Sequence, residues 1–565
     1  MEARNRTIEE WFTWIHQGLV VLPRFQRFEA WGLGQIEGIL ENILRKPALP
    51  VGALLVLAVG SPPPFHARPI VGAPKPSVPP TCHLLDGQQR LTALWRSLSD
   101  NYEDVSFFVA ADGGAEPDVQ AVRRYRKKDQ RHPLWCDIPA EAWARKLLPV
   151  RLLRPGDVGA QAFETWMQEA AGGDIATLMA INKVGTDLRH RVASYPLPFL
   201  ELPLGTDKNV ALDVFIKMNT MNTALSAFDI VVAQVEAAID ESLHQKVEGL
   251  KALVPDLADF GEPGEIAMQV AAVLAGKAPV RATFLTESFG KELIARWPLV
   301  EKGLRRAVDF LAEERIFASD LLPADPLLTL LGAFWASAPD GKDGEGNARR
   351  LARRALWTGS FSERYQKTSA TRTELDHRQL VAYRDAGGPL PDLLDPVLTP
   401  LPEAAALRSA GWPKTRDRLG RAVLAASLRL GGHDFADEAP FSRATLKRRE
   451  YHHLFPQAFL TERGVPRRAI FTALNCALIS WRTNRTISAK PPSVYMAERA
   501  GELQLTEAQI DRRLLTHAIP PAALRSDDYE GFLEERAIMI HKAMSQLCAG
   551  EPFDFTALKE LQPTD

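Results

Sequence analysis

Two adjacent histidines and two later asparagines have the types and order that suit phosphodiester cleavage. His452 and His453 stand in "REYHHLFPQAFL", and Asn475 and Asn484 follow in "LNCALISWRTNRTISAKPPSVYM". Cutting a phosphodiester needs an activated water and a metal ion on the leaving oxygen. In this interpretation His453 activates the water and Asn475 holds the histidine loop through backbone contacts. His452 and Asn484 bind the metal. Paired histidines also fit ordinary surface or core positions, so this interpretation depends on the features around them.

The expected metal ligands include no carboxylate. Mg²⁺ prefers hard, anionic oxygen ligands, so a site built on His452 and Asn484 suits it poorly. Either the substrate phosphate supplies the missing charge, or the site takes Mn²⁺ or another borderline metal. Glu450 is close in sequence but out of register with the motif.

Positive charge gathers around these residues. Residues 441–490 contain ten Lys or Arg and two acidic residues, a net charge of +8, whereas the whole chain has a formal net charge of −2. Such a cluster is typical of a phosphate-binding surface, and a solvated basic face is the alternative. The residues expected to bind DNA are Arg448, Arg449, Arg482, Arg485 and Lys490.

A second candidate site lies at the start of a predicted helix in "HLLDGQQRLTALWRSL", residues 83–98. Asp86 and Gln89 fit a helix cap, with Asp86 as the N-cap residue. A glycine at a helix start lets an anion approach free N–H groups, and the fork of Arg90 suits phosphate oxygens. Gly87, Gln88 and Arg90 therefore favour a phosphate or nucleotide site in addition to the cap.

Two further polar segments accompany this one. "PRFQRFEAW" carries Gln26 and Arg27, and "FIKMNTMNTALSAFD" carries Asn219. The second segment also fits a capping box of Ser226 and Asp229. The chain has no phosphate loop of the G-x-x-x-x-G-K-[ST] kind, and the nucleotide, GTP or ATP, is not distinguished by these residues.

Together the segments resemble a known family. The three N-terminal segments resemble the N-terminal domain of GmrSD-type restriction proteins, whose fold is ParB/sulfiredoxin-like. The His–His…Asn…Asn segment resembles the HNH (ββα-metal) nuclease motif of their C-terminal domain, and residues 359–377 resemble the helical segment before that nuclease. The sequence departs from the family at His452, where HNH enzymes commonly have Asp or Glu, and at Asn222, near which relatives usually show glycine. The nucleotide pocket that the resemblance implies comprises Gln26, Arg27, Asp86, Gly87, Gln88, Gln89, Arg90 and Asn219.

Composition limits the class of protein. Of the 565 residues 46% are hydrophobic and 24% charged, as in ordinary globular proteins. The four cysteines form no CxxC pair, which argues against a zinc ribbon and a disulfide framework. The longest apolar run, residues 51–60, is half the length that spans a bilayer. We expect a cytoplasmic protein without a membrane partner.

The elements that must position these residues divide into three expected domains. The fold class is multidomain and mainly α with α+β parts. Residues 1–240 form a ParB-like nucleotide-binding domain, 241–435 a helical linker domain, and 436–565 an HNH nuclease domain with C-terminal helices. Local patterns predict a helix after a Thr7–Glu10 capping box, a helix over 32–46 and a buried strand in 51–59.

The function implied is a nucleotide-regulated HNH endonuclease, with NTPase activity in its N-terminal domain, that cuts foreign, modified double-stranded DNA in antiphage defence. Its cofactors are a divalent metal, Mg²⁺ or Mn²⁺, and an NTP. One alternative is a non-cleaving sensor that binds nucleotide and DNA through a degenerate nuclease site. Another is an RNA-cutting toxin. Self-association into a homo-oligomer is left open.

Overall fold

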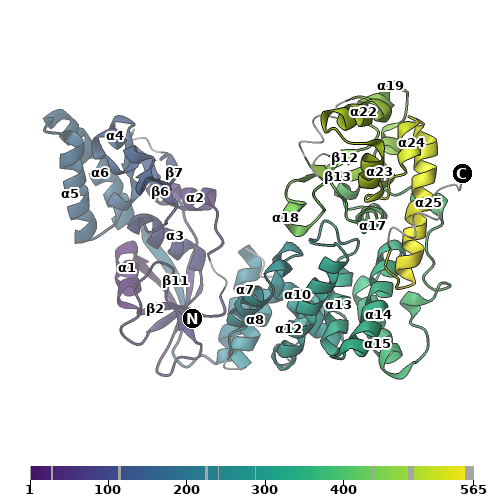
Figure 1. Cartoon of the computed structure of the whole chain (residues 1–565). Coiled ribbons are helices and arrows are strands. Elements are labelled where there is room, and N and C mark those ends of the chain that lie inside the picture. Colours follow the sequence, from purple (N-terminus) through teal and green to yellow (C-terminus); the bar gives the residue numbers. More distant parts are fainter. Residues whose placement is uncertain are drawn as a thin grey trace, which may run out of the picture. The chain divides into compact units, whose positions relative to one another are not determined.

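The computed structural model describes residues 2–26, 29–111, 116–222, 227–238, 241–286, 288–435, 438–480 and 489–553 (Figure 1). The chain forms two compact units, Met1–Ser242 and Leu243–Asp565. Helices predominate and several sheets accompany them, which confirms the expected mainly α chain with mixed parts. Within the described residues no helix is long and apolar enough to cross a membrane. The three domain boundaries and the ParB-like and ββα-metal folds stay predictions.

The first unit is built on a six-stranded sheet. Its strands, in sheet order, are β1 (Glu2–Thr7), β11 (Pro196–Leu202), β3 (Leu54–Ala58), β5 (Cys82–Asp86), β2 (Val20–Pro23) and β4 (Ala67–Arg68). β11 pairs parallel with β3, and β2 pairs parallel with β5, while the other neighbours are antiparallel. Residues 54–57 of β3 are all buried, as expected of a strand covered on both faces. The predicted strand in 51–59 is therefore confirmed.

Three helices near this sheet carry the local signals read from the sequence. They are α1 (Ile8–Gln17), α2 (Leu33–Leu44) and α3 (Gln88–Ser99). The capping box at the start of α1 is confirmed: Thr7 accepts a hydrogen bond from the Glu10 amide, and the Glu10 carboxylate accepts one from the Thr7 amide. Aromatic contacts join α1 to the core, since Trp11 meets Phe199 of β11 with ring centroids 5.2 Å apart.

Smaller elements complete the first unit. A three-stranded sheet has the order β10-β6-β7, and β8 pairs with β9. Their bounds are β6 (Val105–Ala110), β7 (Val119–Arg123), β8 (Tyr125–Lys127), β9 (Gln130–His132) and β10 (Leu147–Pro149). The helices are α4 (Pro139–Ala144), α5 (Asp157–Ala171), α6 (Ile175–Ala193), α7 (Lys208–Asn222) and α8 (Ala227–Ala238).

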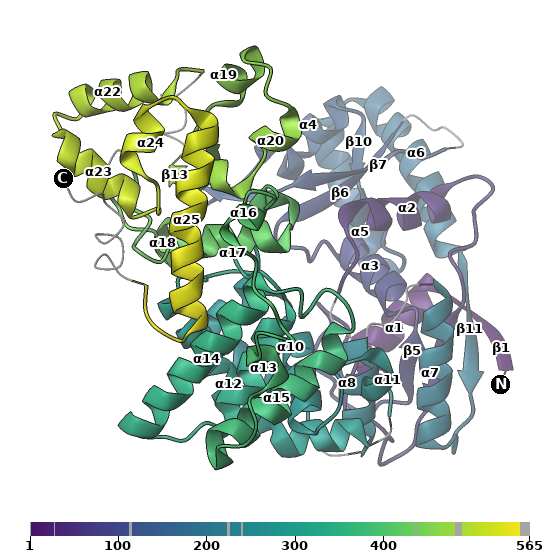
Figure 2. The same ribbon diagram turned by 90° about the vertical axis from the view of Figure 1, so that its right-hand side faces the viewer.

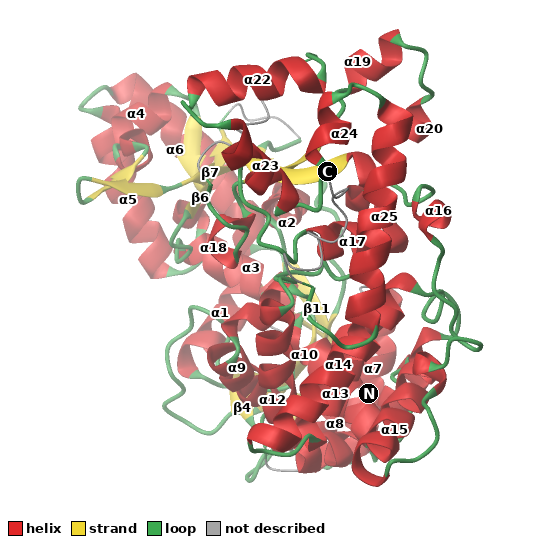
Figure 3. Ribbon diagram, turned by 45° about the vertical axis from the view of Figure 1, so that its right-hand side comes forward, coloured by secondary structure: helices red, strands yellow, loops and turns green. Residues whose placement is uncertain are grey.

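The second unit begins with helices, drawn in red in Figure 3. They are α9 (Leu243–Leu253), α10 (Pro263–Leu274), α11 (Arg281–Phe284), α12 (Phe289–Glu313), α13 (Pro326–Ser337), α14 (Lys342–Phe361), α15 (Ser369–Ala386), α16 (Ala404–Leu407), α17 (Arg418–Ser427) and α18 (Arg443–Leu446). Residues 327–336 of α13 are all buried, because α10, α12 and α15 pack around it. A helix that is apolar on every side forms the centre of such a bundle.

A short antiparallel hairpin follows in the second unit. β12 (Arg449–His453) pairs with β13 (Cys476–Ser480), with His452 opposite Ala477 and His453 opposite Cys476. The long helix α25 contacts α14, α16 and α17 (Figure 2). The remaining elements are α19 (Gln457–Glu462), α20 (Arg467–Ile470), the 3-10 turn η6 (Ala473–Asn475), α22 (Pro492–Glu502), α23 (Glu507–Leu515), α24 (Pro521–Arg525) and α25 (Tyr529–Cys548).

Candidate functional site

His453, the last residue of β12, lies between two aromatic rings. Its imidazole stacks on Trp412, with centroids 4.2 Å apart and an angle of 18° between the planes, and the edge of Phe471 meets it at 4.6 Å. Burial lowers the pKa of His453 to about 4. Its Nε2 atom is buried and has no hydrogen-bond partner among the described residues. At pH 7 the ring is therefore neutral, and a neutral imidazole has one nitrogen that can accept a proton.

The loop that carries Trp412 is fixed from two sides. On one side Ala410 O accepts hydrogen bonds from the Ala473 amide at 3.0 Å and from Thr472 Oγ1 at 2.9 Å. On the other side Asp417 Oδ1 accepts from the amides of Gly411 at 3.0 Å and Gly420 at 2.6 Å. Trp412 thus has little freedom to leave His453. The sequence interpretation missed Trp412, because it lies far before the histidine motif and no local pattern marks it.

Asn475 binds the backbone that follows the histidines. Its side chain is fully buried. Oδ1 accepts from the Phe455 amide at 2.8 Å, and Nδ2 donates to Phe455 O and Ile470 O, both at 3.1 Å. The Asn475 carbonyl accepts from the Leu454 amide at 2.9 Å. The side chain therefore sets the path of the histidine loop, and its part in catalysis stays a prediction.

A buried arginine supports Asn475 from α25. Arg536 is fully buried, and its Nη1 donates to the carbonyls of Leu474 and Cys476, on either side of Asn475. Its Nη2 and Nε donate to His517 O and Ala518 O, each at 3.2 Å. Burial lowers the pKa of Arg536 to about 10. Four backbone carbonyls take the place of a carboxylate and hold this cation in the interior.

The expected metal site is described only in part. His452 is 6% exposed and lies opposite Ala477 in the hairpin, whereas Asn484 lies outside the described residues. Across the described ranges no group of three or more His, Cys, Asp or Glu side chains could hold a metal ion. One imidazole and one amide are a borderline donor set. The metal and its ligands accordingly stay a prediction.

The expected DNA-binding residues have different environments. Arg448 is exposed. Arg449 was expected to contact DNA, and the structure corrects this: its side chain is 2% exposed and pairs with the buried Asp434 at 3.0 Å. Lys490 pairs with Glu498 at 2.5 Å. Arg482 and Arg485 lie outside the described residues. Two further exposed arginines, Arg467 and Arg468 of α20, directly precede the Phe471 segment that contacts His453.

The predicted cap at the start of α3 is wrong. Gly87, not Asp86, is the N-cap residue, with a φ of 90°, and a glycine has no side chain that could cap the first turn. Asp86 still belongs to β5, and its carboxylate pairs with Arg90 at 2.9 Å. Arg90 Nη1 also donates to Val51 O at 3.2 Å and to Ala53 O at 3.0 Å. The arginine expected to meet phosphate therefore also holds the loop before β3.

Two glutamines of the predicted nucleotide pocket bind main-chain groups. Gln26 is buried and donates through Nε2 to Leu84 O at 2.6 Å and to Leu85 O at 2.9 Å, and its Oε1 has no partner among the described residues. Gln89 Oε1 accepts from the amides of Ala30 at 2.8 Å and Trp31 at 3.2 Å. The segment after β2 is thereby tied to the end of β5 and the start of α3.

The structure brings most of the predicted nucleotide residues to one place. Asp86, Gly87, Gln88, Gln89 and Arg90 follow one another at the β5–α3 junction, and the side chain of Gln26 reaches β5 beside them. Arg27 lies outside the described residues. Asn219 belongs to α7, which contacts β5, but its side chain is not described. Gly87 at the N-cap of α3 has no side chain to block an approaching group, and a helix N-terminus attracts a phosphate.

Comparison with known proteins shows what the first unit is similar to. Residues 8–236 match the family described as "GmrSD restriction endonuclease, N-terminal domain". This match supports a GmrSD-type restriction protein. An uncharacterized protein, MJ0686, from Methanocaldococcus jannaschii is 24% identical over 530 residues, which cover 86% of this chain and 85% of that protein. The likeness to this relative therefore extends well beyond the matched N-terminal domain.

Replacing Gly87 by alanine is expected to destabilise the first unit. The new Cβ would lie 2.2 Å from Leu54 Cδ2, and the φ of 90° is unfavourable for alanine. Strain and overpacking together predict a loss of about 2–3 kcal/mol in the free energy of unfolding. Gly38→Ala is the matched control, because its Cβ meets nothing within 4 Å in the helix α2. It should be neutral or stabilising, by up to about 1 kcal/mol. Equal effects of the two substitutions in urea unfolding would contradict this packing.

Replacing Asn475 by alanine is expected to cost about 3 kcal/mol, because an amide and two carbonyls lose their partners in the interior. Asn347→Ala, on the exposed face of α14, should change the free energy of unfolding by less than about 0.5 kcal/mol. Denaturant unfolding followed by circular dichroism measures both. A loss below about 1 kcal/mol for Asn475→Ala would mean that its hydrogen bonds do not hold the loop.

Proposed function

We propose that the chain is a nucleotide-regulated HNH endonuclease that cuts foreign, modified DNA in antiphage defence. The restriction-endonuclease family of residues 8–236 supports a restriction-related function with DNA as the substrate. The observation that carries the nuclease assignment is His453. Its neutral, partly buried imidazole is held against Trp412 on a strand whose following loop is bound by Asn475.

In the proposed reaction His453 removes a proton from the attacking water. Its pKa of about 4 makes it a weak base in the free protein. The negative charge of a DNA phosphate near the ring favours the protonated form and raises this pKa toward the value that proton transfer needs. Trp412 keeps the ring plane fixed, and Asn475 keeps the loop in place. Both act as positioning residues.

A divalent metal, Mg²⁺ or Mn²⁺, belongs to the proposal. His452 and Asn484 would hold it, and it would stabilise the charge on the leaving oxygen. Because this donor set has no carboxylate, an oxygen of the substrate phosphate is needed to complete it. The same lack of a carboxylate favours the second candidate function, a sensor that binds nucleotide and DNA without cutting.

The proposed nucleotide site is the β5–α3 junction. An NTP phosphate would accept hydrogen bonds from the first-turn amides of α3 and approach Arg90, which now pairs with Asp86. Hydrolysis of GTP or ATP at this site is part of the proposal. The buried Oε1 of Gln26 supplies a further polar atom near β5.

His453→Ala is expected to lower DNA cleavage at least about 100-fold, because the general base is lost. The assay uses phage DNA with modified and with unmodified bases, with Mg²⁺ or Mn²⁺, and with and without NTP. His541→Ala, a histidine on α25 outside the hairpin, is the control and should cut like the wild type. Equal cutting by the wild type and His453→Ala would contradict the assignment. DNA retention without any cutting by the wild type would favour the sensor.

Arg90→Ala is expected to weaken binding of GTP or ATP at least about tenfold in calorimetry. The substitution also removes bonds to Val51 and Ala53, so a comparison of stability is needed. Arg96→Ala is the matched control: it lies on the same helix and loses comparable bonds to Glu29 and Asn101. Both variants should unfold at a lower temperature, but only Arg90→Ala should lose nucleotide affinity. Equal affinities of the two variants for GTP or ATP would contradict a nucleotide site at the β5–α3 junction.

A further inference from the structure

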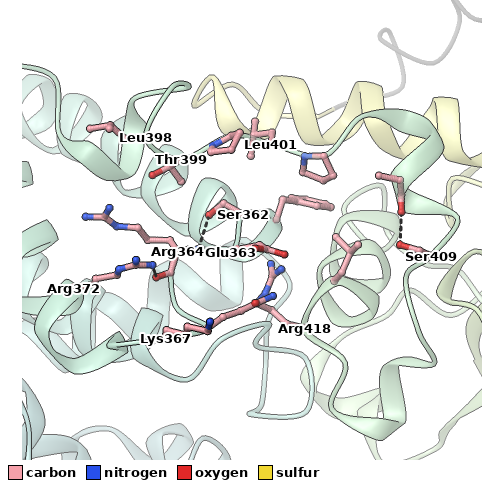
Figure 4. A pocket seen from close by; sticks show the side chains of 16 residues that line it. Ser362, Glu363, Arg364, Lys367, Arg372, Leu398, Thr399, Leu401, Ser409 and Arg418 are labelled. Atoms are coloured by element: carbon pink, nitrogen blue, oxygen red, sulfur yellow. Dashed lines mark hydrogen bonds between the residues drawn. The ribbon is translucent and has the colours of Figure 1, made fainter.

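A cavity of about 610 Å³ lies in the second unit, away from the hairpin motif (Figure 4). Its walls come from the end of α14, the segment into the first turn of α15, the loop 398–402, the segment 406–409 and the start of α17. The charged side chains that line it are Glu363, Arg364, Lys367, Arg372 and Arg418. Four cations and one carboxylate make this a basic cavity.

One of these cations is neutralised inside the protein. Arg364 donates to both carboxylate oxygens of Asp376, whose side chain is fully buried, and Tyr365 donates to the same carboxylate at 2.8 Å. Burial raises the pKa of Asp376, while Arg364 opposes that rise. Arg364 therefore shapes the wall of the cavity and contributes little free charge.

The other three cations have no such carboxylate. Arg372 Nη1 donates to the backbone carbonyl of Arg364, and Arg418 Nη1 donates to Ser360 O at 2.6 Å. Lys367 is exposed. Among the described residues no ion pair within 4 Å joins Lys367, Arg372 or Arg418 to an acid. The exposed Glu363 lines the same cavity and attracts Arg418, so the unpaired side chains carry a net charge of about +2.

Two features favour an anion between these side chains. Arg418 Nε is buried without a partner in the described structure, and an unsatisfied buried donor is costly. Lys367 and Arg372 lie on either side of the N-terminus of α15, a helix of 18 residues whose N-cap, Thr368, makes no side-chain cap. The dipole and free amides of such a helix attract negative charge. Guanidinium forks and an ammonium group together suit phosphate oxygens.

The cavity shares a wall with the segment that holds His453. Ser409 lines the cavity, and Trp412, three residues later, stacks on His453. Three residues of chain span at most about 11 Å. A nucleic-acid strand carries a phosphate about every 3.4 Å along the helix axis, so one strand could reach from Ser409 to the His453 ring within a few nucleotides.

From this geometry we propose that Lys367, Arg372 and Arg418 bind the phosphate backbone of the DNA strand whose scissile phosphate reaches His453. This inference rests on the proposed nuclease function. It adds a contact outside the hairpin motif, in the segment between α14 and α17. The site recognises phosphate rather than bases, so it contributes affinity and strand position without sequence preference.

The test measures binding separately from cutting. The full-length His453→Ala protein is titrated with a labelled DNA duplex over a range of salt concentrations, alone and with Lys367→Ala/Arg372→Ala added. We expect the cavity variant to bind at least about tenfold more weakly, with a salt slope smaller by about two. Lys302→Ala/Arg378→Ala removes the same charge from positions that do not line the cavity, and should change neither value much. Thermal unfolding checks that both variants fold.

The outcomes separate this inference from the proposed function. If the cavity variant and its control bind DNA equally, the inference is overturned, whether or not the wild type cuts. Another outcome is that the wild type never cuts DNA while the cavity variant still binds DNA more weakly and with a smaller salt slope. In that case the proposed DNA contact is supported and the proposed nuclease function is contradicted. Loss of affinity for inorganic phosphate or ATP, with DNA binding unchanged, would overturn the inference in favour of a free anion. If the cavity variant loses more affinity for single-stranded RNA than for DNA, the inference is overturned in favour of an RNA-binding site.

Discussion

The buried amide of Asn475 is the constraint on which the candidate nuclease centre depends. In the interior each polar atom needs a hydrogen-bond partner, because a buried donor or acceptor without one costs about 1–3 kcal/mol of stability. The side chain of Asn475 makes hydrogen bonds with the amide and the carbonyl of Phe455 and with the carbonyl of Ile470. Few other paths of the loop would allow all three bonds. Arg536 fixes the carbonyls on both sides of it. The position of His453 therefore follows from a polar network that does not include its own ring.

The aromatic contacts of His453 set its chemistry. Stacking on Trp412 and contact with Phe471 shield part of the ring from water, and this partial burial lowers its pKa. A neutral imidazole can accept a proton, but a pKa near 4 limits how strongly it does so. Bound phosphate changes this balance, because its negative charge favours the imidazolium. The site would thus gain basicity when the substrate arrives, while remaining uncharged before that.

Some local signals in the sequence predicted the structure correctly and one did not, while the tertiary contacts could not be predicted. The Thr7–Glu10 capping box is confirmed because its partners are three residues apart. The predicted cap at Asp86 failed because Arg90, one turn away, competes for the carboxylate and Gly87 starts the helix. Counting charges placed Arg449 on a DNA-binding surface, yet its partner Asp434 could be found only in three dimensions. No local sequence pattern predicts the stacking of Trp412 on His453, because the two residues are far apart in the chain.

A cation that is already paired with an acid is less available to DNA, and this distinction changes what a basic stretch of sequence implies. The +8 of residues 441–490 includes Arg449 and Lys490, which are bound to acidic partners. By contrast, Lys367 and Arg372 lie outside that basic region, and among the described residues no acid pairs with either. A chain with a net charge of −2 can therefore hold a phosphate wherever folding leaves cations without carboxylates. Where folding instead buries a cation against a carboxylate, as with Arg449 and Asp434, the pair contributes to the fold.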